Sequence, residues 1–456
     1  MMRSMFSGVS GLRAHQTRMD VIGNNIANVN TVGFKSGRVT FKEIFSQTVR
    51  GAAAPDSQTG RGGTNPMQVG LGISVSSIDT LHTRGSLQRT DNPTDLAIEG
   101  EGFFIVKGGK DDTYRFTRAG NFGLDKLGNL VNPDGMNVYG WQQLKEGSTT
   151  EYDTEQPLEA INIYEGKRTI SAKETSKAVF EGNLDASLTG PVSSKSEPAL
   201  FDDTAGPYTY TDILTNVDGK ETFSVPYTIY DKLGNEYTIT LTFVKNIVDD
   251  TTDPAQPTTQ WFWYTDQVDP STDIGAQGYV KFDENGKITE GQTASMDFIP
   301  PVEAGTNQFP VTLDFSNLTQ FKTDGSVKAT DVNGYPPGKL VTFNIGSDGV
   351  ITGVYSNGEQ QSLGMVGLAF FENPAGLQKV GANLYIPTTN SGDFKKGVKP
   401  GTEGVGTLSP GTLEMSNVDL SKEFTEMITT QRGFQANSRI ITTSDEMLQE
   451  LVNLKR

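Results

Sequence analysis

Apolar residues recur at alternating intervals of four and three positions along the last stretch of the chain, residues 416–456. This spacing places them on one narrow stripe of an α-helix. Three stripe positions are polar, namely Gln431, Ser438 and Asp445, and they lie seven residues apart. The apolar positions of the stripe are Leu420, Phe424, Met427, Phe434, Ile441, Leu448 and Val452. At 1.5 Å per residue the sequence predicts one helix of roughly 50 Å.

Two features of this C-terminal helix bear on its start and its partner. Ser416 and Asp419 have the Ser-x-x-Asp spacing of a capping box, and Glu423 places negative charge near the N-terminal end. Regularly spaced polar residues in an apolar stripe fix the register and partner number of a coiled coil. The alternative is a helix that docks along its own domain.

The first 28 residues repeat the pattern. Steps of three and four from the N-terminus give a stripe whose apolar members are Met2, Met5, Val9, Leu12, Met19 and Ile26. The helix is expected to end near residues 28–31, where Asn and β-branched residues precede Gly33. Residues 1–50 carry a net charge of +5 and residues 414–456 carry −2. The two helices could therefore pair with each other or with further copies of the chain.

Between the helices the chain has the texture of short β-strands separated by glycine. Residues 223–229 and 237–243 alternate apolar and polar side chains on either side of a turn, which predicts an antiparallel hairpin with one dry face. Pro226 predicts that the first of these strands lies at an edge. Trp261 and Trp263 share one face of a strand and are expected to pack in a sheet core rather than bind a ligand.

The predicted fold class is mainly β with long terminal α-helices that pair as a coiled-coil-like stalk, plus two nested β-rich domains. A chain of 456 residues is long enough for two to four domains. We expect four parts: a terminal helical domain of residues 1–30 and 415–456, an extended connector of residues 31–70 and 392–414, an inner β domain of residues 71–149 and 336–391, and an inserted outer β domain of residues 150–335. The connectors are rich in Gly and Pro and lack periodicity.

Charge and composition exclude several classes of function. Because the whole chain carries −17, residues 51–413 carry −20 and lack the basic stripe of a nucleic-acid-binding protein. The absence of cysteine excludes disulfides, thiolate zinc sites and cysteine nucleophiles. No apolar run approaches the ~18 residues of a membrane helix, and the first 14 residues lack the apolar core of a cleaved secretory signal. We therefore expect no membrane insertion, and either a cytoplasmic protein or export without cleavage.

Residues suited to catalysis are scarce. His15 and His82 are the two histidines, and His15 lies off the helical stripe, where a solvated side chain is expected. The sequence has no phosphate-binding loop, no complete dinucleotide-binding glycine motif and no nucleophile elbow. Asp331 begins a segment that resembles a calcium loop but lacks its final glutamate. We expect no enzymatic activity, cofactor or metal, although a hydrolase with paired carboxylates stays an alternative because acidic residues are plentiful.

Several blocks of the sequence resemble the axial proteins of the bacterial flagellum, and in particular the hook protein family. Blocks at residues 95–98, 102–104 and 118–122 and at residues 411–420, 431–437 and 442–447 occur in the family's order. Residues 150–335 match loosely. The block that follows the first helix contains Asn24, Asn25, Ala27, Asn28, Gly33 and Phe34.

The resemblance implies a structural subunit that self-assembles into a flexible helical tube, the hook, which acts as a universal joint between rod and filament. It implies that the stripe residues of the terminal helices make the assembly contacts. The implied partners are copies of the chain, the distal rod, the hook cap, the hook–filament junction proteins and the flagellar type III export apparatus. The implied location is the extracellular hook. Some hook proteins cross-link a cysteine to a lysine, which this cysteine-free chain cannot do.

Two alternatives share the same pattern. Rod proteins have similar ends but lack most of the insert, so a distal rod subunit is one alternative. A secreted β-rich adhesin with a coiled-coil stalk is the other, and it would form a small oligomer rather than a polymer.

Overall fold

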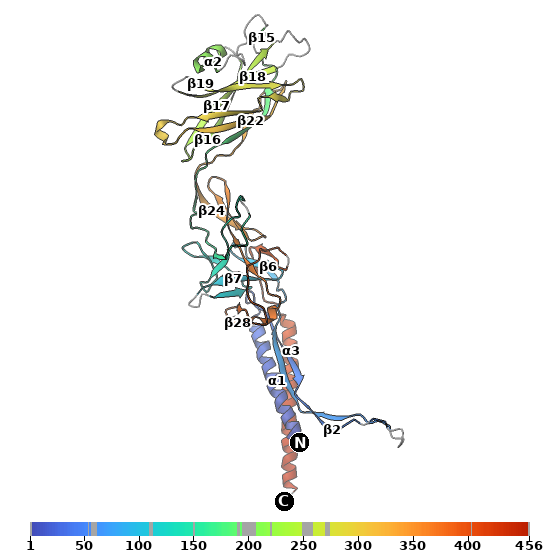
Figure 1. Ribbon diagram of the computed structural model, residues 1–456. Helices are drawn as coiled ribbons and strands as arrows, with labels where there is room; N and C mark the ends of the chain where they lie inside the picture. The colour runs from blue at the N-terminus through green and yellow to red at the C-terminus, as the bar shows by residue number, and fades with distance from the viewer. Residues whose placement is uncertain are drawn as a thin grey trace. The chain divides into compact units, whose positions relative to one another are not determined.

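The computed structural model describes residues 2–52, 54–55, 62–108, 113–148, 151–188, 192–193, 207–218, 221–248, 259–269, 274–402 and 404–454 (Figure 1). The chain divides into two compact units. Unit 1 comprises Met1–Lys167, Thr342–Gly353 and Gln360–Arg456, and unit 2 comprises Arg168–Val341 and Val354–Glu359. Two strands contain unit boundaries, β24 (Gly338–Ile345) and β25 (Val350–Tyr355). The four-part division expected from the sequence stays a prediction.

Unit 1 contains the two terminal helices, α1 (Met2–Ala27) and α3 (Leu420–Asn453), which confirms that both ends are helical and that α1 ends before Asn28. The expected capping box at Ser416 is wrong. Asp419 is the N-cap of α3, because its carboxylate accepts hydrogen bonds from the amides of Ser421 and Lys422. No helix in the described part of the chain is both long and apolar enough to cross a membrane.

The sheets of unit 1 join strands that precede and follow residues 168–341. The pairs are β5 (Leu87–Arg89) with β31 (Thr412–Glu414), β6 (Leu96–Glu99) with β30 (Thr407–Pro410), β7 (Phe103–Lys107) with β27 (Leu368–Ala369), β8 (Tyr114–Thr117) with β29 (Leu384–Ile386), and β11 (Asn137–Trp141) with β26 (Gln360–Val366). Short elements extend this arrangement: β9 (Gly123–Leu124), β10 (Leu130–Val131), β12 (Glu159–Ala160), β28 (Gln378–Gly381) and the 3₁₀ helix η2 (Pro374–Gly376). The core of these sheets contains four aromatic residues that pack together, Phe103, Phe116, Phe371 and Tyr385.

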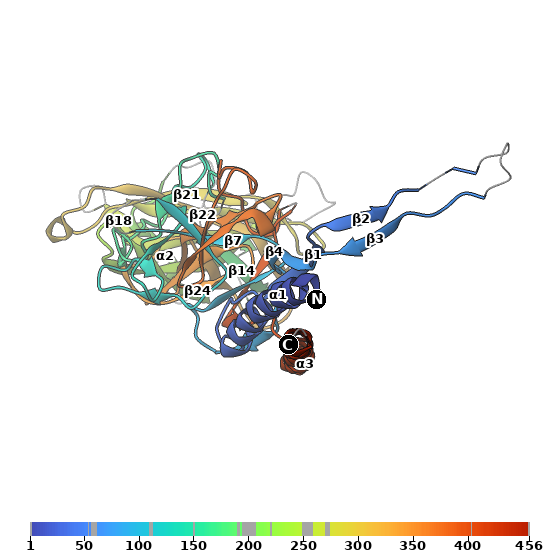
Figure 2. The ribbon, with the colours of Figure 1, turned by 90° about the horizontal axis from the view of Figure 1, so that it is seen from below.

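Residues 31–70, expected as an extended connector, contribute strands to two antiparallel ribbons. The strands β1 (Gly37–Glu43) and β4 (Ile73–Thr80) pair with each other, and β2 (Ser46–Arg50) pairs with β3 (Met67–Gly70). Figure 2 shows the β2–β3 hairpin running outward from the end of the first ribbon. The side chains of β2 and β3 are mostly exposed and those of β1 and β4 mostly half-buried, and none of the four strands has a buried residue. No buried face therefore imposes an apolar alternation on the sequence.

Unit 2 is built on two sheets that share one core. The first runs in the order β21 (Thr293–Phe298), β22 (Phe309–Phe321), β14 (Lys177–Asp185), β23 (Lys328–Val332). The second contains β15 (Val192–Ser193), β16 (Thr222–Tyr230), β17 (Glu236–Val248), β18 (Thr259–Asp269), β19 (Ile274–Phe282) and β20 (Ile288–Glu290). The strand β13 (Thr169–Ile170) pairs with β24, and a 3₁₀ turn, η1 (Val302–Ala304), precedes β22.

The predicted hairpin is confirmed as β16 and β17. Val225 lies opposite Leu241 in the ladder, and both are buried. Among the described residues β16 pairs only with β17, so Pro226 lies at an edge as predicted. Trp261 and Trp263 are buried in the shared core, which confirms their structural role.

The sequence analysis missed one helix, α2 (Tyr210–Val217), which is capped by Thr209. It places Ile213 and Val217 against Phe262 on the second sheet of unit 2. Its eight residues supply too few turns for a helical period to stand out. The mainly β class with terminal helices is confirmed, whereas the coiled-coil-like pairing and the nesting of the domains stay predictions.

Candidate assembly site on the terminal helices

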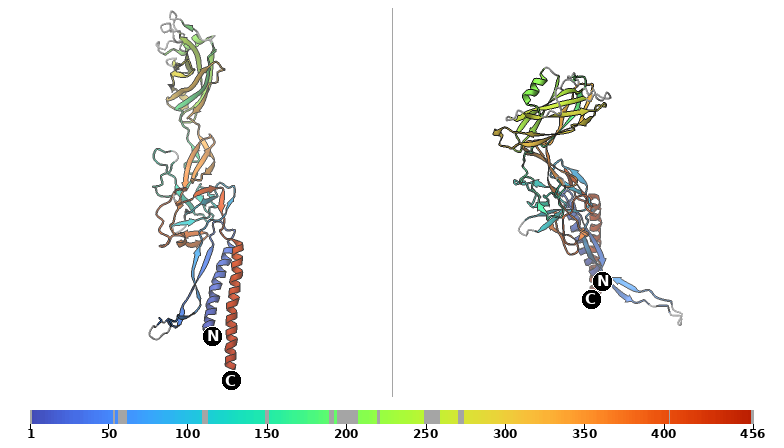
Figure 3. Two further views of the ribbon diagram at one scale, coloured as in Figure 1. Left: turned by 90° about the vertical axis from the view of Figure 1, so that its right-hand side faces the viewer. Right: turned by 45° about the horizontal axis from the view of Figure 1, so that its top comes forward.

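The helices α1 and α3 lie side by side in unit 1 (Figure 3). They run antiparallel, because Ser4 near the start of α1 faces Ser444 near the end of α3, with 3.5 Å between their hydroxyl oxygens. Farther along, the guanidinium of Arg18 pairs with the carboxylate of Glu426 at 2.9 Å. The chain therefore brings its two ends together in one helical pair.

Glycines form the closest contacts between the helices. A Cβ atom on Gly11 would lie 2.7 Å from the side-chain amide of Asn437, and one on Gly433 would lie 2.9 Å from the imidazole of His15. Larger residues at these positions would push the helices apart. The expectation of a solvated His15 is therefore wrong: the ring faces α3, and burial, followed by the charge of Arg18, lowers its pKa.

Other contacts on the inward face, the side of each terminal helix that faces the other helix, are polar. Glu423 and Thr430 on α3 are buried, and in the described structure Glu423 Oε2 and Thr430 Oγ1 have no hydrogen-bond partner. Burial raises the pKa of Glu423. Buried polar atoms without partners weaken a contact. The face that α1 and α3 share therefore includes small and polar groups as well as apolar ones such as Ile441.

The apolar stripe residues predicted from the sequence divide into two groups. Those that are half-buried are Met5, Leu12, Met19, Ile26, Met427, Phe434, Ile441 and Leu448. Those that stay exposed are Val9, Leu420, Phe424 and Val452. Ile441 lies beside Gly8 of α1, where a Cβ would be 3.2 Å from its Cγ1 atom. Their role in assembly stays a prediction.

The buried positions that sequence reasoning missed are mostly small or polar. On α1 they are Gly8, Gly11, Ala14 and Ile22, and on α3 they are Glu423, Thr430 and Ser444. A signal was present, because the small residues of α1 recur every three positions from Gly8 to Ala14. The prediction overlooked it because it equated an inward face with an apolar one.

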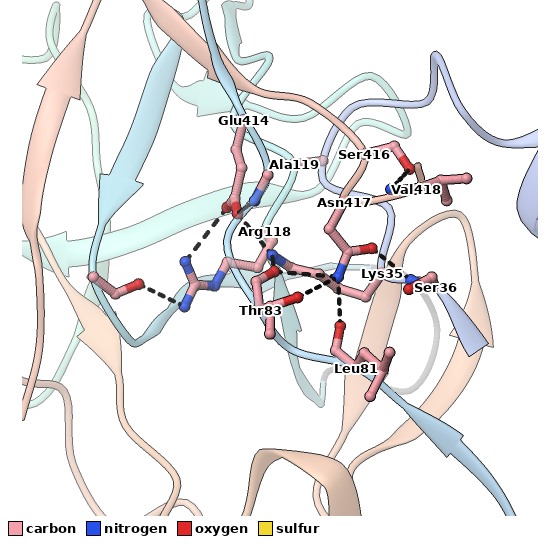
Figure 4. Close-up of polar contacts among 12 residues, drawn as sticks. Lys35, Ser36, Leu81, Thr83, Arg118, Ala119, Glu414, Ser416, Asn417 and Val418 are labelled. Carbon is pink, nitrogen blue, oxygen red and sulfur yellow. Dashed lines mark hydrogen bonds and ion pairs between the residues drawn. The ribbon is translucent and has the colours of Figure 1, made fainter. Parts of the chain in front are cut away.

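A buried ion cluster, the root cluster of Lys35, Arg118 and Glu414, fixes the ends of both helices to the sheet (Figure 4). The carboxylate of Glu414 accepts from the ammonium of Lys35 at 2.7 Å and from the guanidinium of Arg118 at 3.4 Å. The carbonyl of Thr83 accepts a further hydrogen bond from Lys35 and that of Gly100 one from Arg118, whereas in the described structure Arg118 Nε has no partner. Burial lowers the pKa of both cations, and the charge of Glu414 opposes this shift.

Two asparagines fasten the chain around this cluster. The Asn417 side chain accepts from the Ser36 amide at 2.8 Å and donates to the Leu81 carbonyl at 2.8 Å (Figure 4). The Asn25 side chain both donates to and accepts from the backbone of Gly37, at 2.9 Å in each case. The segments that leave α1 and enter α3 are therefore held to each other.

The block of residues after the first helix has a structural explanation at most of its positions. Gly33 has a φ of +68°, and a Cβ there would lie 2.6 Å from the amide nitrogen of Ala119, so glycine is needed. Phe34 is buried beneath the ammonium of Lys379. Asn28 donates to the carbonyl of Asn24 at the end of α1.

The remaining block residue, Ala27, is exposed, as is the side chain of Asn24. Nothing in the structure explains the identity of these two side chains.

His82 lies beside the root cluster, packed edge-on against Phe103 and close to Tyr385. Burial and the nearby charges of Lys35, Arg118 and Lys379 lower the pKa of His82 to about 4. Its ring is therefore neutral at pH 7 and serves as a packing group.

The chemistry of the site is that of an anchor. In the ranges that the structure describes, no group of three or more acidic or histidine side chains is placed to hold a metal. Each charge of the root cluster faces another protein group. The arrangement therefore positions two helices and leaves their outer faces open to other molecules.

Four stretches of the chain match known protein families. Residues 5–35 match the family described as Flagella basal body rod protein, and residues 97–175 match the Flagellar hook protein FlgE/F/G D1 domain. Residues 201–335 match the Flagellar basal body protein FlaE D2 domain, and residues 409–454 match the Flagellar basal body rod FlgEFG protein C-terminal family.

Curated relatives match over the whole chain. The flagellar hook protein FlgE of Borreliella burgdorferi is 40% identical and that of Treponema pallidum is 39% identical, each covering 100% of both sequences. The flagellar basal-body rod protein FlgG of Bacillus subtilis is 32% identical, also over 100% of both sequences. The resemblance inferred from the sequence blocks is thereby confirmed, and the chain belongs to the flagellar hook protein FlgE family.

Proposed function

We propose that this structural subunit of the flagellar hook assembles with copies of itself through its terminal helices, α1 and α3. The observation that carries the proposal is the distribution of apolar surface on these helices. Their closest contacts with each other are made at glycines and include polar groups, whereas Phe6 is 67% exposed and Phe424 is 50% exposed. Apolar rows left open in this way are typical of surfaces that other molecules cover.

Six of the eight exposed large apolar residues from Leu420 to Leu454 form two separate rows, and Ile440 and Val452 lie outside them. Leu420, Phe424 and Ile428 follow one another at intervals of four, and Met447, Leu451 and Leu454 follow at intervals of four and three. At 3.6 residues per turn Leu451 lies about 20° around the helix from the buried Ser444, so the second row continues the inward face, whereas the first row lies to one side of that face. Two unlike rows allow contacts in two directions, which favours an open polymer over a closed dimer. Full burial of each such side chain contributes roughly 1.5–3 kcal/mol.

Within such a tube, the parts of the chain would have different tasks. The helices of residues 1–30 and 415–456, paired as a coiled-coil-like stalk, would form the continuous inner wall. The inner β domain of residues 71–149 and 336–391 and the outer β domain of residues 150–335, nested within it, would slide against their neighbours. Segments 31–70 and 392–414 would connect the two layers, and the tube would bend as a universal joint that transmits torque.

The further partners follow from the family rather than from a site on the chain. They are the distal rod, the hook cap, the hook–filament junction proteins and the type III export apparatus. We infer export without a cleaved signal peptide and an extracellular place in the hook. The proposal involves no catalytic step, nucleic acid or membrane insertion.

Electron microscopy of negatively stained samples in polymerising salt tests the proposal. We expect curved tubes from the full chain and monomers from a chain lacking residues 1–30 and 415–456. Straight tubes would favour the distal rod alternative, to which the relative named FlgG gives some weight. Small oligomers from both chains would contradict assembly through the helices and favour the adhesin alternative.

A further inference from the structure

An open groove of about 460 Å³ runs along α1 on the side of the β1–β4 ribbon. Its apolar lining comes from α1, from the segment after β1 and from β4, and consists of Phe6, Val9, Ala14, Ile44, Ile73 and Val75. Phe6, Val9 and Ile44 are exposed there. The groove is therefore an uncovered apolar surface that adjoins the helix pair.

Arg13 lies in the middle of this groove on the same face of α1. Its side chain is exposed, and within the described ranges it forms no ion pair. The residues that line the groove include no carboxylate. A well-matched occupant would therefore combine an apolar row with negative charge.

The C-terminal end of α3 has this combination. Met447, Leu451 and Leu454, called the C-terminal row from here on, project from one face and are 49%, 49% and 83% exposed. Glu446 and Glu450 lie one turn apart beside this row and are also exposed. The row extends over roughly 10 Å at 1.5 Å per residue, and the groove face of α1 from residue 6 to residue 17 over roughly 17 Å.

We propose that the C-terminal row of one copy of this chain occupies the α1 groove of a neighbouring copy, with Glu446 and Glu450 facing Arg13. The inference rests on the proposed function, because it supposes that copies of the chain polymerise. The inference adds to the proposed function the two surfaces that meet in one contact between copies. The C-terminal row and the groove are two different surfaces, so a contact between them joins copies head to tail. Such a contact can be repeated from one copy to the next.

The same copy cannot supply the occupant. Ser4 in the first turn of α1 faces Ser444, and α3 continues away from that point as an unbroken helix (Figure 3). The C-terminal row therefore lies beyond the groove of its own chain.

Charge disfavours two other apolar surfaces of a neighbouring copy. The β2–β3 hairpin exposes Val49, Met67 and Val69, but its strands contain Arg50 and no acidic residue.

The exposed row at the start of α3, formed by Leu420, Phe424 and Ile428 and called the N-terminal row, has Lys422 nearby rather than a pair of exposed acids. The acids beside Phe424 already have partners or are buried: Asp419 caps α3, Glu426 pairs with Arg18 and Glu423 is buried. Neither surface therefore offers Arg13 a pair of unpaired exposed carboxylates.

Disulfide trapping between copies tests the contact, and the cysteine-free sequence makes the test specific. Chains carrying V9C and chains carrying L451C are mixed in equal amounts, polymerised with ammonium sulfate and oxidised. We expect a covalent dimer that contains one chain of each kind. A disulfide between the two kinds of chain cannot be intramolecular, and each variant alone shows the background.

Two control mixtures identify other occupants. V9C chains are mixed with V69C chains to test the hairpin, and with F424C chains to test the N-terminal row. Cross-linking in either control mixture, without cross-linking between V9C and L451C, would overturn the inference while tubes still formed. Absence of tubes from the unmodified chain would instead overturn the proposed function, and the inference with it.

Charge reversal gives an independent readout. R13E and E450R should each raise the lowest protein concentration that yields tubes by roughly fivefold, measured by sedimentation at the lowest salt that supports assembly. The double variant R13E/E450R should return to within about twofold of the unmodified chain. Losses that add in the double variant would contradict a contact between these residues.

Discussion

In unit 2, Phe243 and Trp261 have no exposed surface, whereas on α3 Phe424 keeps half of its surface in solvent. The difference lies in what surrounds each ring. Both sheets of unit 2 contribute to one core, so each aromatic side chain finds apolar neighbours within the unit. On the terminal helices, α1 offers α3 glycines such as Gly11 and polar groups such as Arg18. Unit 2 completes its apolar contacts within the chain, whereas the helices leave apolar side chains exposed, which the proposed assembly would cover.

A matched pair of truncations tests this contrast with the largest expected effect. Trp261→Ala should lower the free energy of unfolding of unit 2 by about 3–5 kcal/mol, because it empties a buried site. Phe424→Ala should change the stability of the monomer by less than about 0.5 kcal/mol, because the ring is half exposed, yet it should impair tube formation. Denaturant unfolding followed by circular dichroism measures the first effect, and sedimentation of polymer measures the second. Equal losses of monomer stability would remove the contrast.

Proline substitutions separate the helices from the β-sheets. Phe434→Pro breaks an i→i−4 hydrogen bond in α3 and costs roughly 3 kcal/mol in helix stability. Leu12→Pro does the same in α1. We expect both variants to yield no tubes in the electron microscope and to keep the β signal in circular dichroism. Phe434→Ala is the control for loss of the ring without a helix break. Loss of the β signal would mean that the sheets depend on the helices.

The sequence allowed prediction of those elements whose side chains alternate over a long distance. The C-terminal helix repeats its period over many turns, and the hairpin of β16 and β17 has one dry face, so both patterns stood out. The helix α2 was missed because two inward residues, Ile213 and Val217, make no visible period.

The inward face of the helix pair could not be predicted in the same way. Its closest contacts depend on the lack of side chains at Gly11 and Gly433, which an apolar pattern does not register. The root cluster joins Lys35, Arg118 and Glu414, and nothing in their sequence separation indicates that they meet. Tertiary contacts of this kind are set by the pairing of distant strands. The family blocks identified the region but gave no contact.

The buried His82 beside the root cluster predicts an acid sensitivity of unit 1. The pKa of His82 is lowered to about 4 in the folded protein, against about 6.5 in an unfolded chain. Between these values the unfolded chain binds more protons, so stability should fall as the pH falls from 6.5 to 4, by up to about 3 kcal/mol. Urea unfolding at several pH values measures this change in the free energy of unfolding. His82→Phe should lose this dependence while keeping the packing against Phe103. An unchanged pH dependence in that variant would contradict the assignment to His82.

The helix pair should respond to pH in the opposite direction, and more weakly. Burial raises the pKa of Glu423, so the folded pair binds a proton more readily than the unfolded chain. Stability of the pair should therefore decrease as the pH rises from the ordinary glutamate value of 4.5 through the raised pKa. Glu423→Gln removes the charge and should raise the helical melting temperature at pH 7. Glu426→Gln is the matched control: it loses the ion pair with Arg18 and should lower that temperature. If both variants lower the melting temperature, the buried charge of Glu423 does not destabilise the helix pair, and the polar contacts on its inward face give no support to the proposed need for neighbouring copies.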